Sequence, residues 1–248
     1  MQHDPLVERQ PAAAGCERVR HLAIIMDGNR RWATRRGLHA TEGHRAGIDA
    51  LRRCVRAAPD LGIQILTVYA FSTENWRRSQ LEVDMLMALL VEFLERETPE
   101  LQREQVAIRT IGEVDNLPPL QQQALHRAKA ATAAGERLIL NLALNYGGRS
   151  EIVRACRTLA REVAEGRLTA ADIDEARFAG ALDTGELPDP DLLIRASGEE
   201  RLSNFLLWQL AYTELLVTDT LWPDFDRSHL EAALEEFATR ERRYGGTR

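Results

Sequence analysis

The sequence has few cysteines and no long apolar run. Its three cysteines, Cys16, Cys54 and Cys156, are scattered without C-x-x-C spacing, so neither a disulfide framework nor a thiolate metal site is indicated. The six histidines form no H-x-x-x-H pair. The longest apolar stretch, residues 85–91, is far shorter than the roughly 20 residues that a membrane span needs. With no charged-then-apolar signal segment at the start, we expect no transmembrane segment and a cytoplasmic protein.

The chain also lacks an excess of positive charge and an internal linker. Its 32 basic residues, of which Lys129 is the only lysine, face 38 acidic ones, and a net charge of −6 argues against a general nucleic-acid binder. No Pro/Gly/Ser-rich stretch divides the 248 residues, and 44% of them are hydrophobic, enough for a sizeable core. We therefore expect one domain over residues 21–248, preceded by a flexible arm over residues 1–20.

Short apolar, β-branched runs alternate with segments of helical periodicity. Strands are predicted at residues 21–26, 63–70, 106–111, 138–142, 192–195 and 215–218. Helices are predicted at residues 41–58, 81–97 and 120–135, from Ser150, near residue 169 and at residues 228–242. Alternation of this kind predicts an α/β fold with a mostly parallel central sheet of about six strands, flanked by helices and covered on both faces.

Two of the predicted helices have informative apolar faces. The helix that Ser150 is expected to cap is strongly amphipathic, with an inner face of Ile152, Val153, Cys156, Leu159, Ala160 and Val163. The helix at residues 81–97 is apolar around more of its circumference than a surface helix requires. Core packing is the default explanation for both helices.

The first predicted strand ends in Asp27, Gly28, Asn29, Arg30 and Arg31. A carboxylate beside guanidinium groups suits a diphosphate carried with a divalent cation, because Mg²⁺ needs oxygen ligands and phosphate oxygens need forked donors. The alternative is an ordinary strand-to-helix turn, in which the glycine and asparagine give the backbone its freedom and the arginines face water.

Two other predicted strands end in similar polar segments. Residues 71–78 follow the second strand, and residues 195–203 follow the strand at residues 192–195. All three segments lie past the carboxyl end of a strand, where an open parallel α/β sheet has its ligand crevice. We therefore expect them to line one site.

The polar segments carry a family resemblance. The motifs are M-D-G-N-R-R-W at residues 26–32, G-H at 43–44, Y-A-F-S-T-E-N-W at 69–76, N-Y-G-G-R at 145–149, R-A-S-G-E-E-R-L-S-N-F-L-L-W-Q at 195–209 and L-W-P-D-F at 221–225. In this order, from about residue 21 to residue 246, the sequence resembles the cis-prenyltransferases, of which bacterial undecaprenyl diphosphate synthase is the usual example. The resemblance implies a homodimeric enzyme with an α/β fold and a hydrophobic tunnel.

The resemblance assigns roles to the first segment. It implies that Asp27 holds Mg²⁺ on an allylic diphosphate, neutralising the charge that grows on the leaving group, and that Glu214 completes the metal coordination. It also implies that the diphosphate is bound by Gly28, Asn29, Arg30, Arg31, Trp32 and His44. Arg30 stands at a position that the family varies, so a solvated surface charge is an equal alternative there.

The other two segments are assigned to the second substrate and to the space between the substrates. Arg195, Arg201 and Ser203 would hold the diphosphate of isopentenyl diphosphate, and Ser72, Asn75 and Trp76 would line the space between the two diphosphates. The other residues expected to bind substrate are Thr73, Glu74, Arg78 and Leu202. The family assigns Asn75 to proton loss. A neutral amide is a very poor base, so we interpret Asn75 as a positioning or relay group and expect a diphosphate oxygen to receive the proton.

The resemblance also points to three features outside the polar segments. In the family, the helix corresponding to residues 81–97 and the strands beneath it form the tunnel wall, and the tunnel begins near Ala70. The family usually has an arginine where this chain has Ala40, for which Arg35, Arg36 or His39 would substitute. The R-Y-G sequence at residues 243–245 matches an arm that reaches the partner subunit.

Taken together, the motifs predict a Mg²⁺-dependent isoprenyl transferase that condenses an allylic diphosphate with isopentenyl diphosphate in the cis sense. We expect a long-chain product of the undecaprenyl type, a precursor of cell-wall lipid carriers that is passed to the membrane. The alternatives are a short-chain cis-prenyl diphosphate synthase and a non-catalytic subunit. Such a subunit would have lost Asp27, Asn75 and Arg195, which this chain keeps.

Overall fold

The computed structural model describes residues 18–240. The predicted arm over residues 1–20 lies almost wholly outside this range, as does the C-terminal segment that includes residues 243–245. The described chain folds around one six-stranded sheet in the order β3-β4-β2-β1-β5-β6, in which all pairings are parallel. The predicted single-domain α/β fold is confirmed. The strands are β1 (His21–Ile25), β2 (Ile65–Ser72), β3 (Val106–Ile111), β4 (Leu138–Tyr146), β5 (Leu192–Arg195) and β6 (Glu214–Val217).

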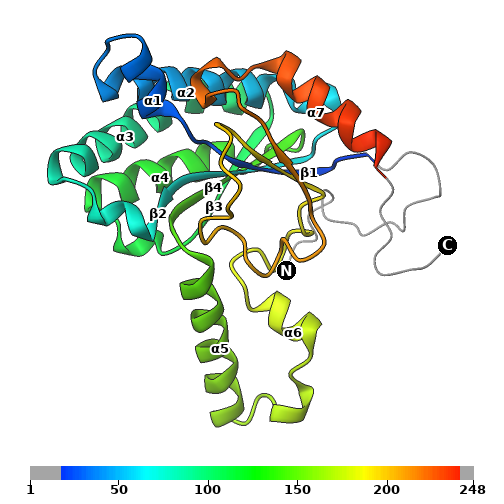
Figure 1. The fold of residues 1–248 in the computed structure, drawn as a ribbon. Helices are drawn as coiled ribbons and strands as arrows, with labels where there is room; N and C mark the ends of the chain where they lie inside the picture. Colours follow the sequence, from blue (N-terminus) through cyan, green and yellow to red (C-terminus); the bar gives the residue numbers. More distant parts are fainter. Residues whose placement is uncertain (1–17, 241–248) are drawn as a thin grey trace.

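Seven helices accompany the sheet in the described residues (Figure 1). They are α1 (Asn29–Arg35), α2 (Ala40–Ala57), α3 (Gln80–Arg103), α4 (Pro119–Thr132), α5 (Gly148–Ala164), α6 (Glu175–Gly180) and α7 (Arg227–Thr239). The sequence did not predict α1, which occupies the arginine-bearing segment after β1. It also ended the third helix at residue 97, but α3 continues through Pro99 to Arg103.

The central strands bury both of their faces, as successive side chains of β1 show. Leu22 and Ile24 pack into the larger core with residues of α2, α3, α4 and α7, whereas Ala23 and Ile25 pack into a smaller core with Phe205. This alternation follows from the two-residue period of a strand. One face of the sheet is therefore covered by helices, and the irregular segment 202–210 contributes much of the cover on the other.

The helix α5 differs from its prediction. Its N-cap is Gly147, and Ser150 lies inside the helix, where its hydroxyl donates to the Gly147 carbonyl at 2.8 Å. Beyond its first turn the helix runs away from the body, with α6 beside it, as an arm (Figure 1). Val153 is 46% exposed, and Cys156 and Ala160 are exposed, so the predicted inner face is wrong for these three residues. The apolar face of α5 has too little of this chain to pack against.

The parallel strands bring three polar segments to one edge of the sheet. Helix α1 follows β1, a 3-10 helix over residues 73–77 follows β2, and the segment after Arg195 follows β5. Because β1 pairs with both β2 and β5, these segments are neighbours. In residues 18–240 no helix is both long and apolar enough to cross a membrane.

Candidate active site

A cleft lies at the carboxyl ends of β1, β2 and β5, with about 1710 Å³ of space including the part that is open to solvent. It brings together most of the residues that the sequence predicted for the site. They are Asp27, Gly28, Asn29, Arg30, Arg31, His44, Ser72, Glu74, Asn75, Arg78, Arg195, Arg201 and Ser203. The cleft thus combines one carboxylate at the end of β1 with arginines from all three segments.

Asp27 is held in a fixed orientation at the floor of the cleft. Its Oδ2 pairs with a guanidinium nitrogen of Arg195 at 3.0 Å, and its Oδ1 accepts from the Gly28 backbone N–H at 2.7 Å. The backbone is fixed as well, because the Trp222 N–H donates to the Asp27 carbonyl at 3.0 Å. The Asp27 side chain remains 34% exposed, whereas that of Arg195 is only 3% exposed. One carboxylate is therefore presented to the cleft by a nearly buried cation.

Arg195 also organises the segment that follows β5. It donates to the Ser203 hydroxyl at 2.9 Å and to the carbonyl of Arg201. Ser203 and Asn204 have φ values of 49° and 64°, in the left-handed region that residues other than glycine adopt only when their surroundings enforce it. The contacts from Arg195 supply part of that enforcement, so this arginine shapes the site besides giving it charge.

A glutamate that the sequence did not predict joins the two arginine groups. Glu199 pairs with Arg31 at 3.1 Å and also with Arg201. Arg31 further donates to the Ser197 hydroxyl at 2.5 Å. A carboxylate between two guanidinium groups occupies a position suited to a phosphate, because both are anionic acceptors for the same forked donors. The motif at residues 195–209 contains Glu199, but the sequence predicted no role for it, since an acidic residue in an anion site contradicts simple charge matching.

Close backbone approaches explain the glycines near Asp27. Gly28 has a φ of 97°, and a Cβ there would lie 2.9 Å from the Leu221 side chain. At Gly43 in α2, a Cβ would lie 2.1 Å from the Asn29 carbonyl oxygen. Any larger residue at either position would move α1 and therefore the arginines that α1 carries.

His44 is neutral and oriented by Asn29. Burial and, to a smaller extent, the nearby charge of Arg78 lower the pKa of His44 from 6.5 to about 4. The Asn29 amide nitrogen lies 3.4 Å from His44 Nδ1, which assigns the ring proton to Nε2. That Nε2 is buried and has no partner within the described residues, and His44 lines the cleft. A neutral N–H donor is therefore available for an oxygen of a bound molecule.

A capping box between Ser72 and Asn75 begins the loop after β2. The Asn75 side-chain oxygen accepts from the Ser72 backbone N–H at 2.9 Å, and the Ser72 side chain accepts in return from the Asn75 backbone. This reciprocal cap points Asn75 toward the cleft and leaves its amide group as a donor, as expected for a positioning role.

Glu74 and Asn204 connect the loop after β2 with the segment after β5. The Asn204 side chain donates to Glu74 at 2.8 Å and accepts from the Arg149 backbone N–H at 2.9 Å. Burial opposes ionisation of Glu74, but hydrogen bonds from Asn204, from its own backbone, from Ser72 and from Thr73 outweigh it and lower its pKa. Asn204 lines the cleft and was missed, because the sequence does not show which segment its amide bridges.

Five predicted site residues do not line the cleft: Trp32, Thr73, Trp76, Leu202 and Glu214. The Trp32 indole N–H donates to Asp224 at 2.7 Å, and the guanidinium of Arg36 lies 4.2 Å from the Trp32 ring centroid. Leu202 packs against the smaller core. The hydroxyl of Thr73 donates to Glu74 at 3.2 Å. The contacts of Trp32, Leu202 and Thr73 thus lie outside the cleft lining.

Glu214 lies farthest from its predicted position. It begins β6 beside Leu192 at the amino end of β5, whereas Arg195, which contacts Asp27, ends β5. Three residues of strand correspond to about 10 Å. The Glu214 carboxylate pairs with Arg240 at 2.9 Å. Within this chain Glu214 therefore does not join Asp27 in a metal site, in contrast to the prediction.

The position of Ala40 leaves few substitutes for the family's arginine. Ala40 is the first residue of α2, and His39 is its N-cap, accepting from the Thr41 N–H. Arg36 is engaged by Asp224 at 3.2 Å and by Trp32. Two of the three proposed substitutes are thus tied to other groups, and Arg35 is left.

An apolar cavity adjoins the polar cleft. It has about 700 Å³ of space, part of it open to solvent, and it lies between α2, α3 and the strands beneath them. Five residues line both the cleft and the cavity: Met26, Asn29, His44, Ala70 and Leu86. A molecule bound by its charged end in the cleft could therefore extend an apolar chain into the cavity.

A second, smaller space of about 410 Å³, part of it open to solvent, lies at the far end of α2 and α3 from the cleft. Phe93, which is 6% exposed, lines both apolar spaces and separates them. The far cavity is bordered by Arg52, whose guanidinium binds the Glu97 carboxylate at 2.7 Å and 2.5 Å.

The donor set of the cleft fits a Mg²⁺ ion bound together with substrate. Within residues 18–240 there is no cluster of three or more acidic, histidine or cysteine side chains that could hold a metal by itself. Mg²⁺ usually takes one or two protein carboxylates and completes its octahedron with water and phosphate oxygens. Asp27, half-buried at the cleft floor, offers one such carboxylate.

Comparison with known proteins agrees with this geometry. Residues 25–245 match the family model described as putative undecaprenyl diphosphate synthase. The chain belongs to this family. An isoprenyl transferase of Heliobacterium mobile is 54% identical over 229 residues, 92% of this chain and 88% of that protein. The ditrans,polycis-undecaprenyl-diphosphate synthase ((2E,6E)-farnesyl-diphosphate specific) of Lactiplantibacillus plantarum is 47% identical over 249 residues, 99% of this chain and 92% of that protein.

Solved structures place the fold in the same family. Lavandulyl diphosphate synthase from Lavandula x intermedia, in complex with dimethylallyl diphosphate, superimposes with a TM-score of 0.89 at 42% identity, over 92% of this chain and 98% of that one. A probable undecaprenyl diphosphate synthase from Campylobacter jejuni gives a TM-score of 0.77 at 32% identity, over 92% of this chain and 99% of that one. The protein is thus an isoprenyl transferase of the cis-prenyltransferase type.

Proposed function

We propose that the protein is a Mg²⁺-dependent enzyme that condenses isopentenyl diphosphate with an allylic diphosphate in the cis sense, repeatedly, to give a long polyprenyl diphosphate. The observation that carries this proposal is the joint wall of the polar cleft and the apolar cavity, formed by residues that include Met26, Ala70 and Leu86. Charged and apolar parts of one substrate can be bound there at the same time.

The cleft has enough cations for two diphosphates. Two diphosphates lying side by side repel strongly, so a two-substrate site should carry more positive charge than one phosphate group requires. Arg30, Arg31 and Arg78 lie on the side of α1 and the β2 loop, and Arg195 and Arg201 lie on the side of β5. We assign the first group to the allylic diphosphate and the second to isopentenyl diphosphate.

The chemical step breaks the bond between carbon and oxygen in the allylic diphosphate and forms a carbon–carbon bond to the double bond of isopentenyl diphosphate; a proton is then lost. Asp27 would hold Mg²⁺ on the leaving diphosphate, where the ion neutralises the developing charge. Arg31 and the neutral His44 donate to the same oxygens. Asn75 orients the isopentenyl group, and a diphosphate oxygen receives the proton, because the amide cannot.

Incubation of the purified protein with Mg²⁺, labelled isopentenyl diphosphate and allylic primers of several lengths tests this proposal. We expect extended products whose formation stops when EDTA removes the metal. Products longer by only one or two units would support the short-chain alternative, which the likeness to lavandulyl diphosphate synthase keeps open. The absence of any product would support a non-catalytic subunit.

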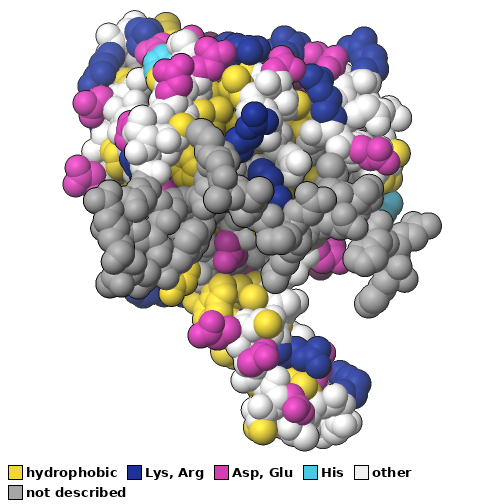
Figure 2. Space-filling view, turned by 90° about the vertical axis from the view of Figure 1, so that its right-hand side faces the viewer, with side chains coloured by type: hydrophobic (Ala, Val, Ile, Leu, Met, Phe, Trp, Pro, Cys, Tyr) yellow, Lys and Arg dark blue, Asp and Glu magenta, His cyan; other side chains and the backbone are white. Residues whose placement is uncertain are grey.

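We also propose that the protein is a homodimer. The arm formed by α5 and α6 exposes Val153 and Ile173, and the hydrophobic side chains on it are visible in Figure 2. The strand β6 forms one edge of the sheet, with Leu215 41% exposed. A second copy of the chain would cover apolar side chains that this chain leaves in water.

A further inference from the structure

Asn75 and Trp76 are adjacent in the loop after β2 but point in different directions. Asn75 lines the cleft, whereas the Trp76 side chain contacts residues behind it. The Trp76 indole N–H donates to the side-chain oxygen of Asn145 at 2.8 Å. The edge of the indole lies against Phe71, with ring centroids 5.0 Å apart. Trp76 therefore fixes the loop from the side opposite to the substrate.

Asn145 uses both ends of its side chain. While its oxygen accepts from Trp76, its amide nitrogen donates to the Glu113 carbonyl at 2.9 Å. Its own carbonyl accepts from the Glu113 N–H at 3.2 Å. Asn145 is 7% exposed and has a φ of 48°, a conformation that persists in residues other than glycine where the surrounding contacts over-determine it.

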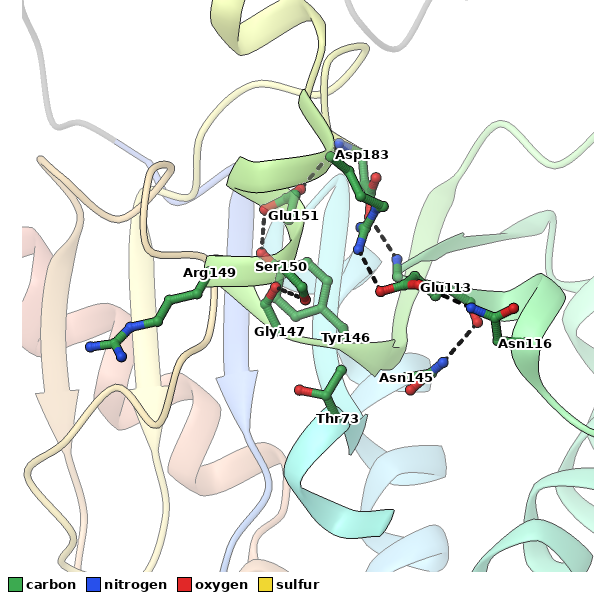
Figure 3. A network of polar contacts seen from close by, with 12 residues as sticks. Thr73, Glu113, Asn116, Asn145, Tyr146, Gly147, Arg149, Ser150, Glu151 and Asp183 are labelled. Carbon is green, nitrogen blue, oxygen red and sulfur yellow. Dashed lines mark hydrogen bonds and ion pairs between the residues drawn. The ribbon is translucent and has the colours of Figure 1, made fainter. Parts of the chain in front are cut away.

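The partner of Asn145 is itself immobilised (Figure 3). The Glu113 carboxylate accepts from Arg154 at 3.1 Å and from Asn116 at 2.9 Å. A second nitrogen of Arg154 donates to Asp183 at 2.5 Å, and the Asp183 carboxylate also accepts from the Gly112 backbone. The network thus extends from the loop after β2 to Arg154 in α5. Within this network, Asn145 is the member that contacts Trp76.

We propose that Asn145 is a positioning residue: through Trp76 it fixes the loop that presents Asn75 to the reacting atoms. This inference rests on the proposed function, because it gives Asn145 a role in the same reaction. Within the loop from Ser72 to Arg78, the Asn75 side chain is held only at its oxygen, by the cap with Ser72, and the 3-10 turn closes when the Arg78 N–H donates to the Asn75 carbonyl at 3.0 Å. The bond from Trp76 to Asn145 supplies a second fixed point one residue beyond Asn75.

The test compares Asn145→Ala, Trp76→Phe and the double variant. Trp76→Phe keeps a ring against Phe71 but removes the indole N–H. We expect each single change to lower kcat about tenfold or more and to change both KM values less than about threefold, because a misplaced group costs rate more than binding. If the two residues act as one pair, the double variant is no slower than the slower single variant. Multiplicative losses would overturn the proposal.

Two further variants separate positioning from folding. Asn145→Asp keeps the acceptor for Trp76 and loses the donor to Glu113, so its kcat should lie between those of the wild type and Asn145→Ala. Asn116→Ala removes an asparagine from the same network without touching the loop and should leave kcat unchanged. Thermal melting gives the folded fraction used to normalise kcat. A normal kcat per folded Asn145→Ala molecule would overturn the proposal, whereas an inactive wild type would instead contradict the proposed function.

Discussion

The ion pair of Asp27 with Arg195 decides which substitution of Asp27 can test its electrostatic role. The guanidinium is almost buried, so a change of Asp27 to alanine leaves a buried charge without its acceptor and endangers folding. An asparagine at position 27 keeps the shape and one acceptor oxygen but loses the charge. The isosteric change is therefore the clean test of the electrostatic role.

We expect Asp27→Asn to lower kcat by at least about 100-fold, because the carboxylate acts where charge develops on the leaving diphosphate. Steady-state kinetics at saturating Mg²⁺ measures this change, with Asp115→Ala on the exposed surface as the control. Turnover close to that of the wild type in a folded Asp27→Asn protein would remove Asp27 from the proposed mechanism.

His21 gives the structure a dependence on pH. It is 1% exposed at the start of β1, with one ring nitrogen 2.7 Å from the Pro188 carbonyl and the other 2.7 Å from the Thr67 hydroxyl. Burial lowers its pKa from 6.5 to about 4, although the Pro188 carbonyl and the charge of Asp191 oppose the shift. The folded state therefore binds fewer protons than the unfolded state between these two values.

The free energy of unfolding should consequently decrease as the pH falls from 6.5 toward 4, by about 3 kcal/mol at most for this group. Above pH 6.5 the contribution is fully present. Urea unfolding at several pH values measures the slope, which we expect to be smaller in His21→Gln and unchanged in His126→Gln, an exposed control. An equal slope in all three proteins would show that other groups, such as His44, cause the dependence.

The sequence predicted individual site residues when their chemistry was visible in a motif. Asp27, Arg195 and Ser203 come together in one cleft as expected. Prediction from the sequence failed for residues whose role depends on a partner far along the chain. Asn145 reaches Trp76 across 69 positions, and only the fold shows that Trp76 turns away from the cleft.

At the scale of elements, strand alternation and helix periodicity were enough for the sheet and for most helices. The exceptions have physical reasons. The seven residues of α1 are too few to show a helical period, and α3 continues through Pro99 because packing outweighs one lost hydrogen bond. The amphipathic pattern of α5 predicted an inner face, but of its six residues only Leu159 is buried, because the pattern does not show whether the chain itself covers that face.

The contact between β2 and α3 offers a test of the apolar cavity. Ala70 lies in β2 and lines both the cleft and the cavity, so a larger side chain there narrows the passage between them. We expect Ala70→Leu to shorten the product, because each buried CH₂ of product gains roughly 0.8 kcal/mol only where there is space for it. Ala70→Gly serves as the control that keeps the passage open. Products of equal length from both variants would place the growing chain elsewhere.

At the scale of the whole molecule, we propose that the arm of α5 and α6 forms the contact between two copies of the chain. If a second copy covers the arm, a charge at Val153 should weaken the association, because an unpaired charge in an apolar contact is costly. Light scattering after gel filtration should show a dimer for the wild type and a smaller mass for Val153→Asp. Leu120→Asp, at an equally exposed position on α4, should remain dimeric. A Val153→Asp protein with the mass of the wild type would place the interface on another surface.

We expect Phe93 to limit the length of the product without closing the apolar space completely. If the proposed condensation is repeated, each round has the same chemistry in the cleft, so the reacting atoms do not record how many units have been added. Only the position of the hydrocarbon tail would record it. A tail that reaches Phe93 meets a single aromatic ring with further space behind it, rather than a closed wall. We therefore expect a product distribution with one main length and a minor tail of longer species, and a distribution shifted toward those species in Phe93→Ala. Beyond that ring, the ion pair of Arg52 and Glu97 borders the second space. This pair sets an upper limit to the product length, because a longer hydrocarbon chain would have to displace a buried ion pair.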